Sequence, residues 1–452
     1  MTRFRVVFIL FILTLIGAFN TRREIYWATT GALFGMLVAA VVWAYVSVNW
    51  LRVGRRTLTR VAQVGQVLEE EFVVANLGRI PKLWLEIRDA STLPQHYASR
   101  VLGSVLGGNR RGWRVQTVCT ERGRFTLGPI KITSGDPLGI YQRSRKIEHT
   151  TSVLVYPATY ELRSFPLRSN VSGGGESLRK RTPHVTTNAA GVREYVMGDS
   201  LNRIHWPLSM RRGHMVVKEF ELDPAAEFWV LLDLYKQGHV IAPEADDDEP
   251  LGEIPTISHI DDETQGQNPK SKIQNFALPP ATAEYAISLA ASIAKHFLTQ
   301  NKALGMLAYA SSTTRNESAH RDAAHKDAAR SHGQREMLQP DRGDRQLNKI
   351  LERLAVVQAQ GEVPFDRVLR AEAMHLPRGS TIVLISASPD PTWGAIAAQL
   401  ARRGGRVVVV LIDAHTFNPA AQPIAPLLTA LSEGGTTVRV VRYGDTFGDV
   451  LA

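Results

Sequence analysis

The chain has 452 residues, of which 44% are hydrophobic, 8% aromatic and 21% charged, which excludes a wholly disordered protein and allows more than one hydrophobic core. Cys119 is the only cysteine, which excludes an internal disulfide and a cysteine-built zinc site and favours a reducing compartment. The formal net charge of +10 suits nucleic acid, anionic lipid or an acidic partner, and because much of it lies beside hydrophobic segments, membrane lipid is the favoured partner.

Two apolar runs near the beginning of the chain predict a transmembrane helical hairpin over residues 1–52. Phe4 to Phe19 is almost wholly apolar, and Ile25 to Leu51 contains no charged residue. A membrane span needs about 20 apolar residues, so the second run is long enough and the first is at the short end. Gly17-Ala18-Phe19 is a poor cleavage site and a second apolar run follows at once, which disfavours a cleaved signal peptide.

The arginines beside the apolar runs predict the orientation of the hairpin. Those near its two ends, away from the connecting turn, are Arg3, Arg5, Arg52, Arg55, Arg56 and Arg60. Arg22 and Arg23 in the connecting turn oppose them weakly, because Glu24 offsets one of the two charges. The positive-inside tendency therefore predicts a two-pass protein of the cell inner or plasma membrane, with its soluble domains in the cytoplasm.

Residues 53–160 show short alternating runs separated by turn residues. Val67 to Val74, Leu83 to Ile87 and Trp113 to Val118 are examples, and Asn76-Leu77-Gly78 supplies turn chemistry. Many short strands in succession predict a small β-sandwich-like domain.

Residues 226–452 alternate strands with helices. The predicted strands are Phe228 to Leu232, Leu304 to Tyr309, Thr381 to Ile385, Val407 to Ile412 and Val438 to Val441. The predicted helices are Thr282 to Leu298, Leu347 to Val357, Thr392 to Arg402 and Ile424 to Leu431. Because the strands are continuously apolar, they predict a parallel sheet covered by helices on both faces.

Two polar insertions interrupt this α/β pattern. The first, about residues 237–274, is acidic, and the second, about residues 311–339, carries His320, His325 and His332. Structureless loops of this length are unusual inside a compact domain. The three histidines leave open a metal site, although a solvated loop is the favoured interpretation.

Residues 161–225 are predicted to form a linker that contains a charged motif, Gly191 to Glu221. Asp199 is expected to N-cap a short helix that includes Trp206 and that Pro207 stops, with Trp206 packed against its surroundings. The basic residues Arg193, Arg203, Arg211 and Lys218 accompany the acidic residues Glu194, Asp199 and Glu219. This set predicts a hydrogen-bonded structural clasp, and an anion or partner site is the alternative.

This motif resembles the signature of the domain of unknown function 58 family. The residues that carry the resemblance are Arg193, Tyr195, Gly198, Asp199, Arg203, Ile204, Trp206, Ser209 and Arg211. Arg122 to Tyr141 and Val155-Tyr156-Pro157 are also similar to that family, and the membrane hairpin fits it. Pro207 departs from the basic residue expected after the tryptophan.

The resemblance implies a von Willebrand factor A-like, Rossmann-like fold for residues 226–452. It also implies association with MoxR-type AAA+ ATPases and no established enzymatic activity.

A von Willebrand A-like domain often binds a divalent ion through a D-x-S-x-S pattern after its first strand, since such ions need several oxygen ligands. Here Asp233 matches, but Tyr235 and Gln237 replace the two serines and Lys236 adds a positive charge. After a later strand, Asp390 is displaced from the position that a ligand would need. The site is therefore predicted to be degenerate and no cofactor is expected, with a metal-dependent ligand-binding domain as the alternative.

The usual catalytic motifs are absent from the sequence. It contains no G-x-x-x-x-G-K-[ST], H-E-x-x-H or G-x-S-x-G, and no RNP-like or zinc-finger pattern that would indicate nucleic-acid binding. Asp199 and His205 keep a hydrolase open as a further alternative, although a structural histidine is favoured. The sequence therefore predicts a non-enzymatic, membrane-anchored scaffold or adaptor that binds a protein partner.

Overall fold

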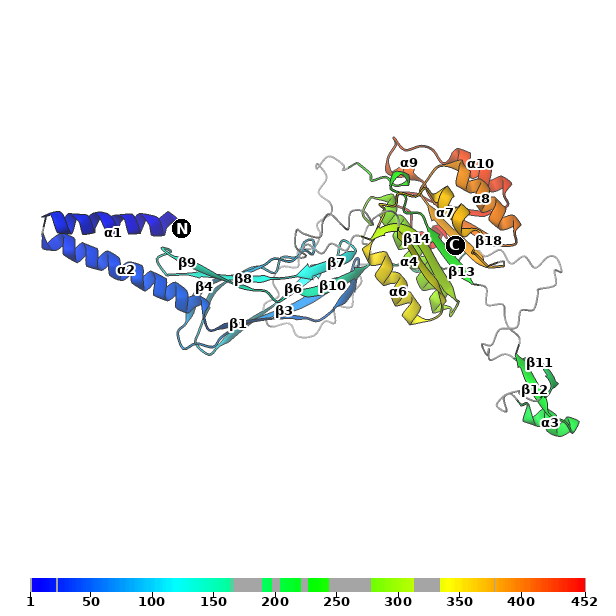
Figure 1. The fold of residues 1–452 in the computed structure, drawn as a ribbon, viewed down its shortest axis with the longest axis horizontal. Helices are drawn as coiled ribbons and strands as arrows, with labels where there is room; N and C mark the ends of the chain where they lie inside the picture. Colours follow the sequence, from blue (N-terminus) through cyan, green and yellow to red (C-terminus); the bar gives the residue numbers. More distant parts are fainter. Residues whose placement is uncertain are drawn as a thin grey trace. The chain divides into compact units, whose positions relative to one another are not determined.

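The computed structural model describes residues 2–21, 23–163, 165, 189–196, 204–220, 227–243, 278–312, 334–377 and 379–451. They fall into two compact units, one holding residues 1–158 and the other most of residues 159–452 (Figure 1).

The first unit begins with the two predicted apolar helices, α1 (Thr2–Thr21) and α2 (Glu24–Val48). They pack closely at their turn, where a Cβ atom on Gly17 would lie only 3.1 Å from the Tyr26 ring. Both helices are long and apolar enough to cross a membrane. Only 6% of an 18-residue apolar stretch of α1, and 28% of the corresponding stretch of α2, is buried. Their apolar side chains are therefore largely uncovered by protein.

The rest of the first unit consists of short, mostly antiparallel strands, in agreement with the alternating sequence pattern. The strands are β1 (Leu51–Thr57), β2 (Val61–Gln63), β3 (Val67–Asn76), β4 (Lys82–Asp89), β5 (Arg100–Val105), β6 (Arg110–Val118), β7 (Gly123–Leu127), β8 (Ile130–Gly135), β9 (Gln142–Ile147) and β10 (Thr151–Tyr156). They form three sheets with the orders β1-β3-β6, β5-β4-β8-β9 and β2-β10-β7.

Side chains from the first two of these sheets share one apolar core. Phe72 of β3 stacks on Trp113 of β6 with ring centroids 5.2 Å apart, and Leu85 of β4 and Ile132 of β8 belong to the same cluster. Inward and outward positions alternate along β3, as expected for strands with one buried face. Two sheet faces packed on one core are the arrangement of a β-sandwich.

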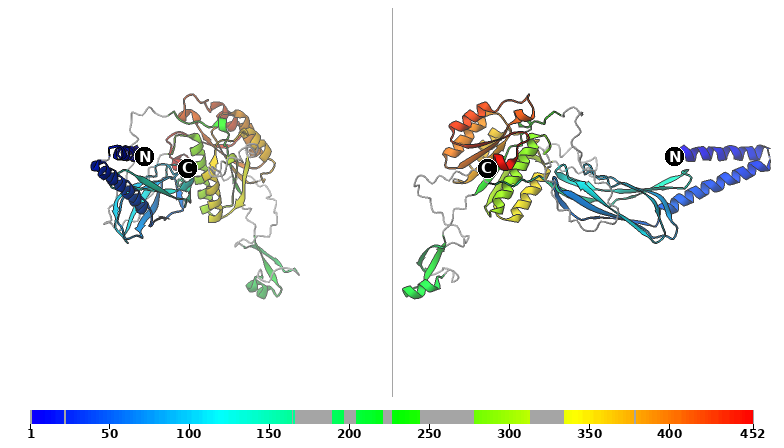
Figure 2. Two further views of the ribbon diagram at one scale, coloured as in Figure 1. Left: turned by 60° about the vertical axis from the view of Figure 1, so that its left-hand side comes forward. Right: turned by 180° about the vertical axis from the view of Figure 1, so that it is seen from behind.

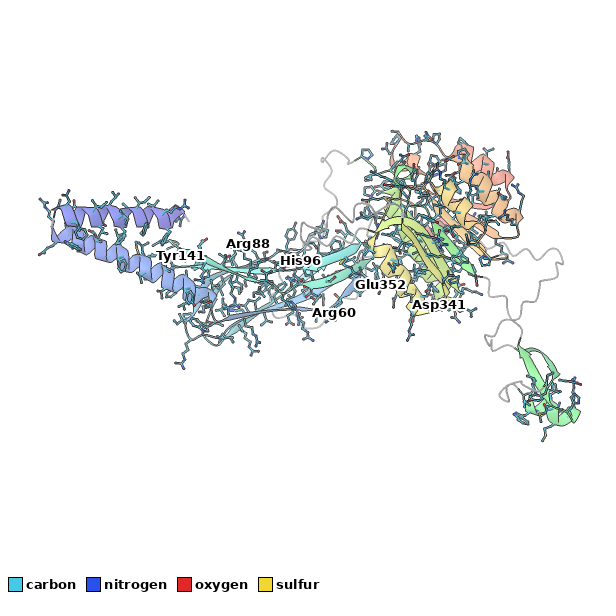
Figure 3. The ribbon with its side chains drawn as sticks, viewed as in Figure 1. Arg60, Arg88, His96, Tyr141, Asp341 and Glu352 are labelled. Atoms are coloured by element: carbon cyan, nitrogen blue, oxygen red, sulfur yellow. The ribbon has the colours of Figure 1, made fainter. Side chains whose placement is uncertain are left out.

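The end of α2 is fastened directly to the sandwich. The Lys82 ammonium group at the start of β4 donates a hydrogen bond to the Val46 carbonyl and lies 5.6 Å from the centre of the Trp50 ring. A second contact comes from the turn between β8 and β9, where Tyr141 lies 5.4 Å from the Phe4 ring (Figure 3). The apolar helices and the sandwich therefore form a single packed unit.

The second unit is built on an open sheet with the order β15-β14-β13-β17-β18-β19. The strands are β13 (Phe228–Leu232), β14 (Leu304–Ser312), β15 (Gln334–Asp341), β17 (Thr381–Ser386), β18 (Arg406–Ile412) and β19 (Thr437–Val441), and β16 (Val357–Gln358) adds two residues beside β14. Within this order, β15 is antiparallel to its neighbour and the other pairs are parallel.

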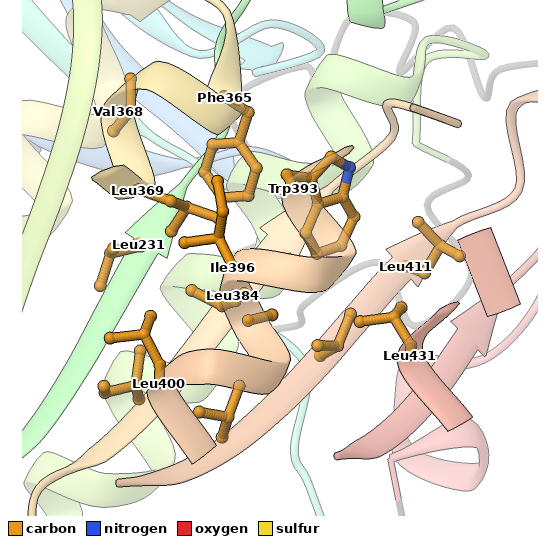
Figure 4. Close-up of a cluster of buried hydrophobic side chains, with 14 of the residues drawn as sticks. Leu231, Phe365, Val368, Leu369, Leu384, Trp393, Ile396, Leu400, Leu411 and Leu431 are labelled. Carbon is orange, nitrogen blue, oxygen red and sulfur yellow. The ribbon is translucent and has the colours of Figure 1, made fainter. Parts of the chain in front are cut away.

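Helices cover both faces of this sheet (Figure 2). They are α4 (Thr282–Thr299), α6 (Asp344–Val356), α7 (Phe365–Glu372), α8 (Pro391–Arg402), α9 (Ala414–Phe417), α10 (Ala425–Glu433) and α11 (Phe447–Val450). Leu231, Leu384 and Leu411 of the sheet pack with Trp393 of α8 and other residues of α7, α8 and α10 (Figure 4). Phe228 faces the other layer and stacks on Phe297 of α4, with ring centroids 4.1 Å apart.

The two insertions are shorter in the structure than the sequence indicates. Residues 237–243 belong to the fold, because Lys236–Gly238 is a 3₁₀ helix and Ile241 pairs with Ala281. The predicted second insertion, 311–339, is wrong at both ends, since it overlaps β14 and β15. β15 was not predicted because its sequence is largely polar, as is common for an edge strand with one exposed side. His320, His325 and His332 lie outside the described residues.

An ion pair fastens this edge strand to α7. Glu372 accepts two hydrogen bonds from Arg335 of β15, both 2.7 Å, and one of 2.8 Å from the Tyr309 hydroxyl of β14. Burial of Glu372 opposes its ionisation, but these hydrogen bonds prevail and hold its pKa below the usual value of 4.5. A lowered pKa means that the ionised form stabilises the fold above pH 4.5, and that this contribution disappears as the pH falls through the folded-state pKa.

Replacing Glu372 with glutamine is expected to cost about 1–2 kcal/mol near neutral pH, because a charge-assisted pair is lost while the partly exposed Arg335 is rehydrated. Faster amide hydrogen exchange in β15 would measure the loss. The difference from wild type should shrink as the pH falls below 4.5 and vanish once the pH is below the lowered folded-state pKa, where Glu372 is protonated in both states. Asp366→Asn, which breaks an exposed pair on the same helix, is the matched control and should cost less than about 0.5 kcal/mol.

Candidate functional site

Asp233 occupies the position in the sheet where ligands are most often bound. It follows β13, whose neighbours β14 and β17 lie on opposite sides of it, so the strand order reverses at this point. In open parallel sheets, ligands bind outside the carboxyl ends of the strands at such a reversal. The sequence analysis singled out the same residue.

The Asp233 carboxylate is buried and held by donors of its own chain. Its Oδ2 accepts a 2.6 Å hydrogen bond from the Ser386 hydroxyl at the end of β17, and its Oδ1 accepts a 3.0 Å bond from the Tyr235 backbone N–H. Only 2% of the residue is exposed. Burial raises the pKa of Asp233, although the nearby His239 and the two hydrogen bonds act in the opposite direction. Asp233 therefore joins the ends of two neighbouring strands.

Several polar groups lie close to Asp233. The Tyr235 hydroxyl donates to the Gln237 side chain at 2.8 Å, and a Cβ atom on Gly238 would lie 3.8 Å from Asp233 Oδ2. His239 lies with Nε2 3.0 Å from the Asp233 carbonyl oxygen. Within the described residues, no group of three His, Cys, Asp or Glu side chains is placed to hold a metal ion.

Asp390, the displaced acidic residue, has a structural task. Its carboxylate accepts hydrogen bonds from the backbone N–H and the hydroxyl of Thr392, at 2.9 and 2.7 Å, and so caps α8 at its N-terminus. The sequence placed it near the site but could not assign this role.

The charged motif forms a small substructure of its own. β11 (Ala189–Glu194), which contains Arg193, pairs with β12 (Val216–Phe220), and Tyr195 donates its backbone N–H to Met215 at 2.9 Å. The short helix α3 (Trp206–Arg212) lies between the two strands in the sequence. Gly198, Asp199 and Arg203 lie outside the described residues, so the predicted clasp around Asp199 stays a prediction.

Three expectations for this motif were wrong, among them Asp199 as the N-cap of the helix that includes Trp206. Pro207 was expected to stop the helix, but it lies in the first turn, where its missing N–H costs no hydrogen bond, and the helix continues to Arg212. The N-cap is His205, whose Nδ1 accepts from the Leu208 N–H at 3.2 Å. Trp206 was expected to pack, but it is 60% exposed, as is common at the first turn of a short surface helix.

Ser209 is the signature residue with the clearest structural role. It is buried, and its hydroxyl donates to the His205 carbonyl at 3.0 Å and accepts from the Val216 N–H at 2.9 Å, which fastens α3 to β12. Arg211 on the same helix is exposed. The described part of the motif thus combines an internal fastening with an exposed tryptophan and arginine.

The sequence analysis missed a buried ionic cluster inside the sandwich. Arg55 of β1 pairs with Asp89 of β4 and lies 3.4 Å from Glu70 of β3. The His96 ring lies between the two carboxylates, with Nε2 3.1 Å from Glu70 and 3.2 Å from Asp89, and its Nδ1 lies 2.8 Å from the Thr117 hydroxyl. All four side chains are at most 3% exposed, so the cluster links the two sheets and is closed to substrates. One feature of the sequence pointed to this cluster: along the alternating strand β3, Glu70 falls on the same buried face as Leu68 and Phe72.

The comparison with known families points to the same motif. Residues 191–250 match the family described as "Protein of unknown function DUF58". This match supports the resemblance drawn from the charged motif. An uncharacterized protein of Bacillus subtilis (strain 168), YeaD, is 27% identical over 118 residues, which are 25% of this chain and 29% of YeaD. The chain thus spans less than a third of the relative's own length.

Solved structures add little to this assignment. The CARDB domain of the PF1109 protein from Pyrococcus furiosus matches 23% of this chain and 91% of that chain, with 20% identity and a TM-score of 0.18. The alkylpurine DNA glycosylase AlkC from Pseudomonas fluorescens matches 32% of this chain and 42% of that chain, with 13% identity and the same TM-score. Likeness at this level carries no argument about fold or function.

Replacing Arg55 with methionine should leave two buried carboxylates without their guanidinium partner and cost about 3–5 kcal/mol. Amide hydrogen exchange in β1 and β3 of the full chain is the measurement. Arg56→Met, on the neighbouring exposed position of the same strand, is the matched control and should change exchange little. Equal effects of the two substitutions would contradict the assigned role of the cluster.

Addition of 1 mM Mg²⁺ or Mn²⁺ is expected to leave the melting midpoint of the α/β unit unchanged, because within the described residues Asp233 belongs to no group of three His, Cys, Asp or Glu side chains that could hold a metal ion. A site that binds with a dissociation constant 100 times below the metal concentration would add about 2.7 kcal/mol, which is readily measured. A rise in the midpoint that EDTA reverses and Asp233→Asn abolishes would refute this expectation.

Proposed function

We propose that this chain is a membrane-anchored, non-enzymatic adaptor whose α/β unit binds a protein partner at the carboxyl edge of its sheet. The observation that carries the proposal is the pair of hydrogen bonds that the Asp233 carboxylate accepts from its own chain. At the position where this type of sheet often holds a ligand, the carboxylate links the ends of β13 and β17. Recognition at this edge then depends on the surface side chains around it.

Membrane anchoring is supported by the exposed apolar side chains of α1 and α2. Ile9, Leu13, Ile16, Phe19 and Phe34 are all more than half exposed. Contiguous apolar surface on this scale is stable in lipid and unfavourable in water. The flanking arginines favour an inner or plasma membrane protein that crosses twice, with both units in the cytoplasm.

The von Willebrand A-like interpretation of the α/β unit is supported by three features. The sheet is parallel apart from one edge strand, helices cover both of its faces, and an aspartate follows its first strand. Such domains recognise partners at the carboxyl edge of the sheet, in agreement with the general position of ligand sites in open α/β sheets.

The partner that we propose is a MoxR-type AAA+ ATPase, on the basis of the family resemblance. The carboxyl edge offers side chains that a partner could contact, among them the exposed Lys236 after β13 and Tyr443, which is 50% exposed, after β19. Tyrosine is one of the residues that are enriched in binding hot spots.

Affinity purification of the full chain from detergent-solubilised membranes, with and without ATP, tests the proposal. An AAA+ ATPase should be recovered, and its recovery should fall about tenfold for Lys236→Glu combined with Tyr443→Ala, the loss typical of a hot spot. Arg403→Glu combined with Met374→Ala makes the same kinds of change at the opposite edge and should leave recovery unchanged. Turnover by the purified chain that Asp199→Asn abolishes would instead favour a hydrolase.

A further inference from the structure

The turn between β8 and β9 packs against the two apolar helices. Ile140, 8% exposed, shares a cluster with Leu37 and Ala40 of α2 and with the partly buried Phe4 of α1. Leu37 and Ala40 lie 11 and 8 positions before the end of α2 at Val48, or about 16 and 12 Å along a helix axis. If α2 spans a bilayer, the tip of this turn lies beside α2 at a depth inside the bilayer.

The turn is shaped so that it can remain there. The buried Asp136 carboxylate accepts hydrogen bonds from the backbone N–H groups of Leu138 and Tyr141, at 2.9 and 2.6 Å. These bonds satisfy donors that would otherwise be costly next to lipid. The apolar side chain of Leu138, at the tip of the turn, is 65% exposed.

A cavity of about 390 Å³ opens beside this turn. Its lining combines three basic side chains, Arg5, Lys131 and Arg143, with the apolar or aromatic side chains of Phe4, Ile140 and Tyr141. Within the part of the chain that the structure describes, none of the three basic groups forms an ion pair with a carboxylate, whereas Lys146 on the same β9 strand pairs with Glu148 at 3.0 Å.

The position of the basic groups agrees with the level of lipid headgroups. The Arg143 guanidinium lies 4.7 Å from the centre of the Tyr45 ring, and Tyr45 is three residues before the end of α2, about 4.5 Å along the axis. Tyrosine prefers this interfacial level, and stacking on it holds the guanidinium there.

We propose that this cavity binds the phosphate group of an anionic glycerophospholipid, with the glycerol and the first acyl carbons against Phe4 and Ile140. The inference rests on the membrane anchoring proposed above. Arginine and lysine are the usual donors to phosphate oxygens, and three such groups around one cavity favour a lipid with net negative charge over a zwitterionic lipid. The bound lipid completes the contact between the sandwich and the bilayer.

Native mass spectrometry of the full chain in mild detergent, titrated with phosphatidylglycerol or phosphatidylcholine, tests the proposal. Wild type should bind phosphatidylglycerol at least about tenfold more tightly than phosphatidylcholine. Arg5→Gln/Lys131→Gln/Arg143→Gln should abolish the preference. Lys131→Gln alone, at an exposed strand position that is safe for folding, should weaken phosphatidylglycerol binding about fivefold.

The matched control removes three arginines at the same end of the sandwich but outside the cavity. Arg79→Gln/Arg110→Gln/Arg111→Gln changes three exposed residues and should retain the preference. Arg79 directly follows Leu77 and Gly78, which lie next to Trp50. Equal loss in the control, or no preference in wild type, would refute a specific cavity. Displacement of the lipid by millimolar glycerol phosphate would show a soluble phosphate ligand and also overturn the proposal.

Extraction of cell membranes with alkaline carbonate separates this proposal from the anchoring on which it rests. Release of the full chain into the soluble fraction would refute the anchoring and the cavity together. Retention in the membrane, with no preference for phosphatidylglycerol, would refute the cavity alone.

Discussion

Apolar surface must be removed from water, and the two parts of this chain meet that constraint in different ways. The α/β sheet meets it internally, because strands such as Phe228–Leu232 are buried on both faces between two layers of helices. The helices α1 and α2 have no such cover over most of their surface. Their stability outside lipid would require the exposure of several large side chains, at about 25 cal/mol for each Å². This uncovered surface is what the membrane anchoring proposed above would place in lipid.

Polar groups buried within each unit serve mainly to link elements. Asp233 joins β13 to β17, Glu372 joins β15 to α7, and Arg55 with its partners joins the two sheets of the sandwich. In each case a charged side chain is surrounded by donors or opposite charges from its own chain, as the cost of burying charge requires. These buried groups link strands and helices to one another, so the side chains that could bind a partner are those on the surface.

The sequence predicted the elements whose side chains carry a strong periodic signal. Phe228–Leu232 was predicted to the residue and α4 to within one residue, because continuous apolar strands and amphipathic helices reveal themselves locally. β15 was missed because an edge strand with the sequence Gln334–Asp341 carries too few apolar residues. The family resemblance singled out Asp233, whereas its hydrogen bond from Ser386, 153 residues away, depends on tertiary structure. The ionic cluster was hidden for the same reason, although Glu70 among inward-facing residues was a local sign of it.

The hydrogen bond from Lys82 to the Val46 carbonyl has a mechanical consequence. It fastens the last turn of α2 to the first residue of β4, and the Trp50 ring covers the same ammonium group. The chain passes from α2 to β1 within three residues, so no flexible hinge intervenes. If α2 spans a bilayer as proposed, a change in its tilt, such as a change in bilayer thickness would impose, is transmitted to the sandwich as a rotation of the whole first unit.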